Sequence, residues 1–170
     1  MKRLCLFLLF ILAVLINPNI KNLSAQEVTN TDELIDVKYE SINPDSDLQY
    51  TFKRLKEKLT LVLFAPFPNK KLGYYETLLG IRLAEYKYVV DKKDISNIQT
   101  VSQRYFTTAG ELVDFSLKNS SVDRKKEIKE TLQKQAAVVN KFKESFNDTT
   151  AEWRFVKHTS DYLDNYMSKL

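Results

Sequence analysis

The sequence predicts an all-α protein, a hairpin bundle of four to five helices that follows an N-terminal signal peptide. Apolar residues recur at steps of three and four through most of the chain after residue 44, which is the periodicity of one helix face. The three glycines all fall within these periodic stretches, and no Asn-Gly or Asp-Gly pair is present to turn a β-hairpin. Short polar corners separate the stretches, as is typical of helical hairpins.

The first 25 residues have the layout of a secretory signal peptide. Lys2 and Arg3 precede the apolar stretch Leu4–Ile16, and the small residue Ala25 suits the last position before cleavage. Thirteen apolar residues cover about 20 Å as a helix, whereas crossing a bilayer core takes about 20 residues. We therefore expect an exported protein, secreted or associated with the cell envelope. An uncleaved N-terminal membrane anchor is the alternative.

Most of the positive net charge of the chain, and its single cysteine, lie in this leader. Cleavage after Ala25 removes three basic residues and no acidic one, so that 26 Lys and Arg residues become 23, against 22 Asp and Glu. A net charge of +1 is no argument for nucleic-acid binding, which needs a concentrated basic face, and we expect no nucleic-acid partner. The single cysteine, Cys5, leaves with the leader, which excludes disulfides and thiol chemistry. A flexible lead-in at 26–43 and one helical domain at 44–170 are expected.

The first helix is expected to begin at Pro44–Asp47 and to end at a proline corner. Asp and Ser side chains precede it and can accept hydrogen bonds from the free amides of a first turn. Pro66 and Pro68 stop it. We expect its periodic apolar residues to face the bundle; they are Leu48, Phe52, Leu55, Leu59 and Val62.

The apolar corner Leu61–Phe67 allows three interpretations. We favour a helix end followed by a tight turn, with the apolar cluster buried in the hairpin, because the stretch continues in phase from the helix before it. A strand is one alternative. The other is an exposed apolar tip, at which Leu63, Phe64 and Phe67 would contact a membrane or an assembly partner.

The second helix is expected over Asn69–Val90, with two parallel rows of residues. Two glycines within a helix cost about 1 kcal/mol each relative to alanine. We therefore expect the row of small residues to pack closely against the first helix, although glycines that are merely tolerated at the surface are the alternative. The small row is Gly73, Thr77, Gly80 and Ala84, and the inward stripe is Leu72, Tyr75, Leu79, Leu83, Tyr86 and Val90.

Three further helices complete the predicted bundle, over about Ile95–Lys118, Val122–Phe146 and from Ala151 onward. Ser121 is expected to cap the second of these three. Their expected inward residues, in chain order, are Ile98, Val101, Tyr105, Leu112 and Phe115; Ile128, Leu132, Ala136, Val139, Phe142 and Phe146; and Trp153, Val156, Leu163 and Met167.

The segment Pro44–Glu85 contains a recognisable pattern: a Pro-Asp-Ser…Tyr-x-x-Lys-Arg-x-x-Glu start, a Pro-x-Lys-Lys corner and an Arg-x-Ala-Glu end. The matching residues are Pro44, Asp45, Ser46, Leu48, Tyr50, Lys53, Arg54, Glu57, Pro68, Lys70, Lys71, Arg82, Leu83, Ala84 and Glu85. This pattern resembles a family of exported bacterial and archaeal helical domains of unknown function. The resemblance implies an extracytoplasmic helical domain and supplies no activity. Phe67 replaces the family's usual Asp, which implies a looser corner.

Four charged residues are the leading candidate cluster: Arg54, Glu57, Arg82 and Glu85. If the first two helices form an antiparallel hairpin, these residues can form an ion network across the seam. We favour a structural network over a ligand-binding site, since exposed ion pairs are common and contribute only about 0–1 kcal/mol each.

Other patterns give no support for chemistry. His158 has a helical neighbour in Asp161, but no second His and no retained Cys complete a metal site, so no metal and no cofactor are expected. No nucleophile elbow or phosphate-binding loop occurs, and no catalytic residue is assigned. Most aromatic residues fall on core stripes; Tyr74, Tyr88 and Phe106 lie beside them and are candidates for a stacking surface.

These observations favour a non-catalytic interaction or structural module of the cell envelope with protein partners. The alternative is a membrane-surface or assembly-binding protein that uses the apolar corner Leu61–Phe67. An enzyme of an unrecognised kind is the third and least favoured reading.

Overall fold

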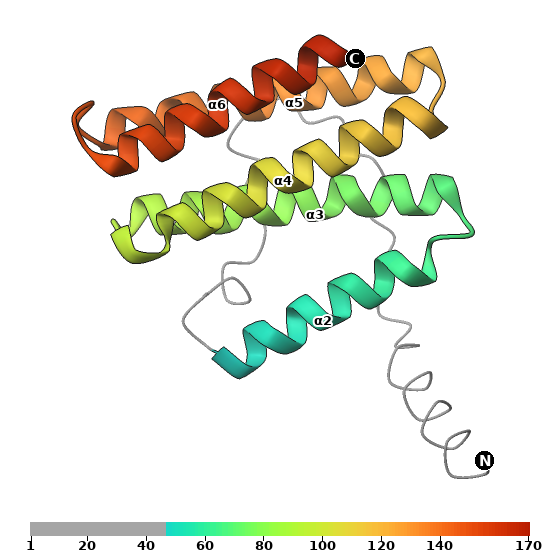
Figure 1. Ribbon diagram of the computed structural model, residues 1–170, viewed down its shortest axis with the longest axis horizontal. Coiled ribbons are helices and arrows are strands. Elements are labelled where there is room, and N and C mark those ends of the chain that lie inside the picture. The colour runs from blue at the N-terminus through green and yellow to red at the C-terminus, as the bar shows by residue number, and fades with distance from the viewer. Residues whose placement is uncertain (1–46) are drawn as a thin grey trace.

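The structure, a computed structural model, describes residues 47–170 as five α-helices and one short 3-10 helix (Figure 1). This confirms the predicted all-α bundle. The predicted signal peptide and lead-in lie outside the described residues. The helices are α2 (Asp47–Leu63), α3 (Pro68–Asp91), α4 (Ile95–Asn119), α5 (Val122–Phe142), η3 (Lys143–Ser145) and α6 (Ala151–Lys169).

The bundle is built from two helical hairpins, with α2 added at one edge. The most extensive contacts among the described helices join α3 to α4, α4 to α6, and α5 to α6. Figure 1 shows α3 and α4 side by side, the α5–α6 pair beyond α4, and α2 on the opposite side of α3. Within the described part of the chain, α2 is not among the closely packed helix pairs.

Within residues 47–170, the buried core lies among α3, α4, α5 and α6. The inward stripe predicted for the second helix is buried along its whole length, and Leu79, Tyr86 and Tyr105 are almost wholly inaccessible. Tyr105 donates a hydrogen bond of 2.8 Å from its hydroxyl to Oε1 of buried Gln135. The stripes predicted for the last three helices are also mostly buried, with Phe115, Phe146, Trp153 and Met167 only partly so.

Side-chain caps start α5 and α6. The Ser121 hydroxyl accepts a hydrogen bond from the backbone N–H of Arg124, as predicted, and Thr150 plays the same part for Trp153. The fourth predicted helix is shorter than expected, because a 3-10 turn follows Phe142 and the chain is extended at Phe146. Asn147 then accepts from the backbone N–H of Thr149, a local turn that competes with further helix.

Two expectations for the first hairpin are wrong. The face of α2 that was expected to point inward is exposed at Phe52, Leu55, Leu59 and Val62. The small row on α3 is not closely packed against α2 at its glycines either: among the described residues, a Cβ added at Gly73 or Gly80 would meet no atom within 4 Å.

The corner also differs from the favoured interpretation. The helix does end at Leu63, before the prolines, but the apolar cluster Leu61–Phe67 is not buried in a hairpin. Val62, Leu63 and Phe67 are exposed, whereas Leu61 and Phe64 are partly buried. The exposed apolar tip, which was the alternative, is what the structure contains. Phe67, the residue before α3, makes no side-chain hydrogen bond that would cap the helix.

Candidate functional site

A buried ion network joins α2 to α3 and α4. Arg82 lies at its centre and donates from Nη1 to both carboxylate oxygens of Glu85, at 2.9 Å each, and from Nη2 to Glu57 Oε2. Lys53 Nζ lies 2.8 Å from Glu85 Oε1. Glu57, Arg82 and Glu85 are each less than a tenth exposed. The network therefore holds α2 against the bundle through charges that have been removed from water.

The structure brings together three of the four residues that the sequence singled out. Arg54 is the exception: it is exposed and makes no ion pair within residues 47–170. Lys53 takes the expected place, because residues 53 and 57 are four apart and share one helix face. Position 54 is rotated by about 100° from position 53.

Sequence reasoning missed a further cation beside the network, Arg104 of α4. Its Nη1 lies 3.8 Å from Glu85 Oε2, and the ring of Tyr50 covers the guanidinium at 4.7 Å from the ring centroid. Neither terminal nitrogen has a hydrogen-bond partner among the described residues. No periodic pattern marks this position, since the contact depends on the approach of α4 to α2.

Buried Arg82 and partly buried Arg104 differ in their electrostatic surroundings. Burial lowers the pKa of Arg82, but the carboxylates of Glu85 and Glu57 outweigh burial and raise it above its usual value. Burial lowers the pKa of Arg104 to about 10. No carboxylate offsets this effect, because the nearest one, of Glu85, is beyond hydrogen-bond distance. Both remain cations near neutral pH, so they act as structural charges and not as proton donors.

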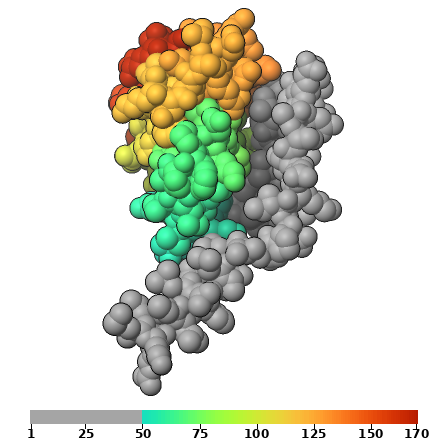
Figure 2. All heavy atoms as spheres, turned by 90° about the vertical axis from the view of Figure 1, so that its right-hand side faces the viewer, coloured from blue at the N-terminus to red at the C-terminus, as the bar shows by residue number. Residues whose placement is uncertain are grey.

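The second feature is an apolar surface on the side of α2 that faces away from the bundle. We call it the outer face and define it as Phe52, Leu55, Leu59, Val62 and Leu63, continued by Phe67 at the corner. Its residues are between 39% and 69% exposed. Figure 2 shows α2 at one edge of the helical layers, with α5 and α6 at the opposite edge.

The outer face includes two of the three predicted contact residues, Leu63 and Phe67. The third, Phe64, is turned partly inward and packs edge-to-face against Tyr74, with ring centroids 5.8 Å apart. Lys70 lies over the Phe67 ring at 5.1 Å from its centroid. Apolar and basic groups therefore meet at the corner.

Between residues 50 and 63 of α2, the exposed charges all have one sign. Glu57 is the only acidic residue between positions 50 and 67, and it is buried in the ion network. The exposed charged side chains of that stretch are Arg54, Lys56 and Lys58. At about 100° per residue, Lys56 and Lys58 fall on the two flanks of the outer face, opposite Glu57. Glu57 therefore fixes the rotation of α2, and because it is buried, only basic residues flank the outer face.

The remaining candidate for a metal ligand, His158, lies apart from the ion network and from the outer face. Within residues 47–170, no group of three side chains is placed to hold a metal ion, and no helix is long and apolar enough to cross a membrane. His158 is exposed and lines a groove between α4 and α6. A second cavity of about 440 Å³ beside the ion network is lined by both basic and acidic residues.

Comparison with protein-family models, with curated proteins and with solved structures finds no match to this chain. The resemblance over Pro44–Glu85 therefore stays a prediction.

Proposed function

We propose that this protein is a non-catalytic, exported interaction module that docks on the surface of an anionic membrane through the outer face of α2. One observation carries the proposal. The apolar side of an amphipathic helix points away from the bundle, while Glu57, the only acidic residue between positions 50 and 67, is buried on its opposite side.

The arrangement matches the physical requirements of an interfacial helix. Such a helix lies in the plane of the bilayer surface, with its apolar side among the upper acyl chains and its basic residues near the headgroups. Lys56 and Lys58 flank the outer face and can extend their ammonium groups toward phosphates while their alkyl stems stay on apolar surface. Phe67 and Lys70 extend the same combination to the corner.

Charge favours lipid over the other occupants of an apolar helix face. A second copy of this chain would bring its own Lys56 and Lys58 against those of the first, and like charges repel. A protein partner in the envelope, which the sequence favoured, would have to supply an acidic rim around an apolar groove. An anionic bilayer supplies both parts at once.

The test is co-sedimentation of residues 26–170 with lipid vesicles. Among the described residues, the buried core lies in α3–α6, and residues 26–170 contain all of it. We expect binding to vesicles that contain phosphatidylglycerol and much weaker binding to pure phosphatidylcholine. The double variant Phe52→Ser/Val62→Ser should lose at least about tenfold in partitioning, since each buried apolar side chain contributes about 1.5–3 kcal/mol.

The matched control is Ile95→Ser/Val122→Ser, which removes two equally exposed apolar side chains outside α2. This variant should bind vesicles like the parent. Equal loss in both variants, or equal binding to neutral and anionic vesicles, would contradict the proposal. Self-association without vesicle binding would indicate that the outer face binds a second copy of the chain. Absence of both vesicle binding and self-association would favour a protein partner.

A further inference from the structure

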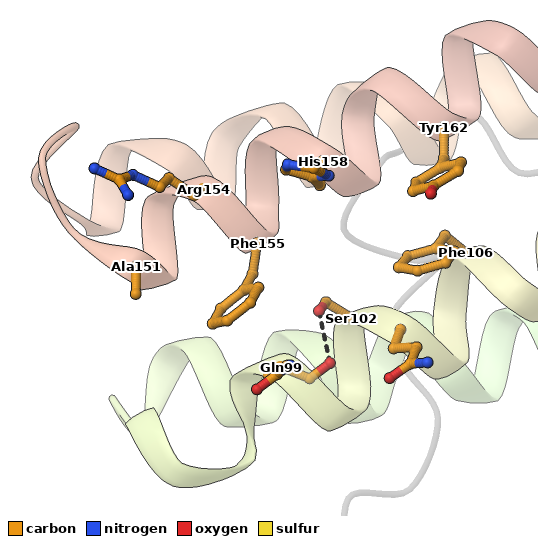
Figure 3. Close-up of a pocket in the computed structure, with 9 residues that line it drawn as sticks. Gln99, Ser102, Phe106, Ala151, Arg154, Phe155, His158 and Tyr162 are labelled. Atoms are coloured by element: carbon orange, nitrogen blue, oxygen red, sulfur yellow. Dashed lines mark hydrogen bonds between the residues drawn. The ribbon is translucent and has the colours of Figure 1, made fainter.

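A groove between α4 and α6 is the second surface feature of the bundle (Figure 3). Its volume is about 520 Å³, within the range of about 300–1,000 Å³ that is usual for small-molecule sites. It is separate from the outer face of α2, which lies beyond α3 (Figure 1). The inference below is therefore independent of membrane docking.

Aromatic side chains form one part of the groove. Phe106 of α4 and Tyr162 of α6 stack with ring centroids 4.4 Å apart and planes 15° apart. Tyr166 continues the stack, at 6.1 Å from Tyr162. Phe155 points from α6 toward α4 across the groove (Figure 3). Phe106 is one of the three aromatic residues that the sequence placed beside the core stripes.

Gly110 explains why this stack is held so close to α4. A Cβ at this position would lie 2.7 Å from the hydroxyl oxygen of Tyr166, so only glycine leaves room for that ring. The aromatic wall is therefore built into the packing of α4 against α6.

Polar side chains without partners surround the same groove. The amides of Gln99 and Gln103, the guanidinium of Arg154 and the imidazole of His158 all line it. Within the described part of the chain, none of these four side chains makes a hydrogen bond or an ion pair. The groove is lined by one full positive charge, on Arg154, and no carboxylate from residues 47–170 opposes it.

We propose that this groove binds a small ring compound that carries a carboxylate. The ring packs on Phe106 and Phe155, as ring faces do on aromatic side chains. The carboxylate pairs with Arg154, whose planar fork suits two parallel hydrogen bonds. Gln99 and Gln103 offer both donors and acceptors to the remaining ring substituents. A uronic acid and an aromatic acid share this chemistry.

The experiment is ligand-observed NMR, followed by calorimetry, on residues 26–170 with four probes. Glucuronate carries a sugar ring and a carboxylate, and benzoate carries an aromatic ring and a carboxylate. Glucose lacks the charge, and acetate lacks the ring. We expect saturable binding of glucuronate or benzoate, with glucose and acetate at least tenfold weaker. The tighter of the two ring acids identifies the source of the ligand.

Two single-charge variants of α6 localise the binding. Arg154→Gln should weaken the ring acid at least about tenfold, since it removes the only full charge of the groove. Lys157→Gln removes the same charge from an exposed side chain that pairs with Asp161 and does not line the groove, and should change nothing.

Several outcomes would overturn the proposal. They are no binding of either ring acid up to about 10 mM, acetate binding as tightly as the ring acids, and equal effects of the two variants. Failure here leaves the vesicle experiment unaffected, because that experiment depends on α2 alone.

Discussion

Helix α2 and the four-helix body α3–α6 are held in place by opposite kinds of interaction. The body packs by apolar stripes that are mostly buried. Helix α2 docks through the ion pairs of Lys53 and Glu57, with Leu61 packed against the core, and leaves most of its apolar stripe exposed. Apolar burial is non-directional and adds up over area. A buried ion network is directional and strongly penalised when one partner is missing. The comparison teaches that an amphipathic pattern predicts a helix without saying which side of it docks.

The largest expected effect comes from removing the central charge of the network. Arg82→Met leaves Glu57 without its partner in a buried place, and breaking a buried pair in this way costs about 3–5 kcal/mol. The least costly relief is release of α2, which returns Glu57 to water. Amide hydrogen exchange should therefore show α2 losing protection while α4 and α6 keep theirs.

Arg54→Met is the matched control for that variant, since Arg54 is exposed and makes no ion pair within residues 47–170. It should leave the exchange of α2 unchanged. Loss of protection throughout the bundle in Arg82→Met would show that the two regions do not separate as described.

A core truncation should have the opposite distribution. Leu132 is fully buried in α5, and Leu132→Ala should lower the free energy of unfolding of the whole body by about 2–5 kcal/mol. Chemical denaturation followed by circular dichroism measures this change. If instead only α2 lost protection, the body would not be the cooperative unit that its packing indicates.

A smaller effect, of opposite sign, is expected on α3. Gly80→Ala adds a methyl group where no described atom lies within 4 Å, and alanine is favoured over glycine within a helix by about 1 kcal/mol. The variant should therefore raise the midpoint of chemical denaturation. Gly110→Ala is the contrasting variant, because its Cβ would clash with Tyr166. A gain in stability at Gly110 as large as that at Gly80 would contradict the close packing of α4 and α6.

The smallest effect on stability is expected at the outer face. Leu55 is 53% exposed, so Leu55→Ser should change the free energy of unfolding by no more than about 0.5 kcal/mol. Thermal unfolding of the variant beside the parent measures this difference. A loss as large as that for Leu132→Ala would mean that Leu55 is buried in solution.

Periodicity alone predicted most of the fold. The stripes of α3, α4 and α5 were placed correctly because their burial is driven by apolar area, which the sequence displays directly. The orientation of α2 was not predictable in this way, since it depends on which of two sides meets Arg82. The prediction of Arg54 in place of Lys53 failed for the same reason. The two positions differ by one residue around α2, and only the location of the partner helix decides which of them faces it.

The features that cross between helices were the least accessible from the sequence. Arg104 carries no signal of its own, and its role comes from the ring of Tyr50 and the carboxylate of Glu85. In the α4–α6 groove the sequence singled out Phe106 as a candidate stacking residue and His158 as a candidate metal ligand. Arg154 and the two glutamines look like ordinary surface residues until the spacing of the two helices is known.

The position of Glu57 also implies that α2 has two possible rotations about its axis, one with its apolar side outward and one with that side against the bundle. Apolar residues of similar volume in place of both Glu57 and Arg82 would abolish the charge that sets its rotation, and such exchanges often leave a protein as stable as before. The helix would then be free to rotate by half a turn about its axis and to pack its apolar side against α3. The pair Glu57 and Arg82 thus decides whether the apolar side of α2 faces outward or packs against the bundle.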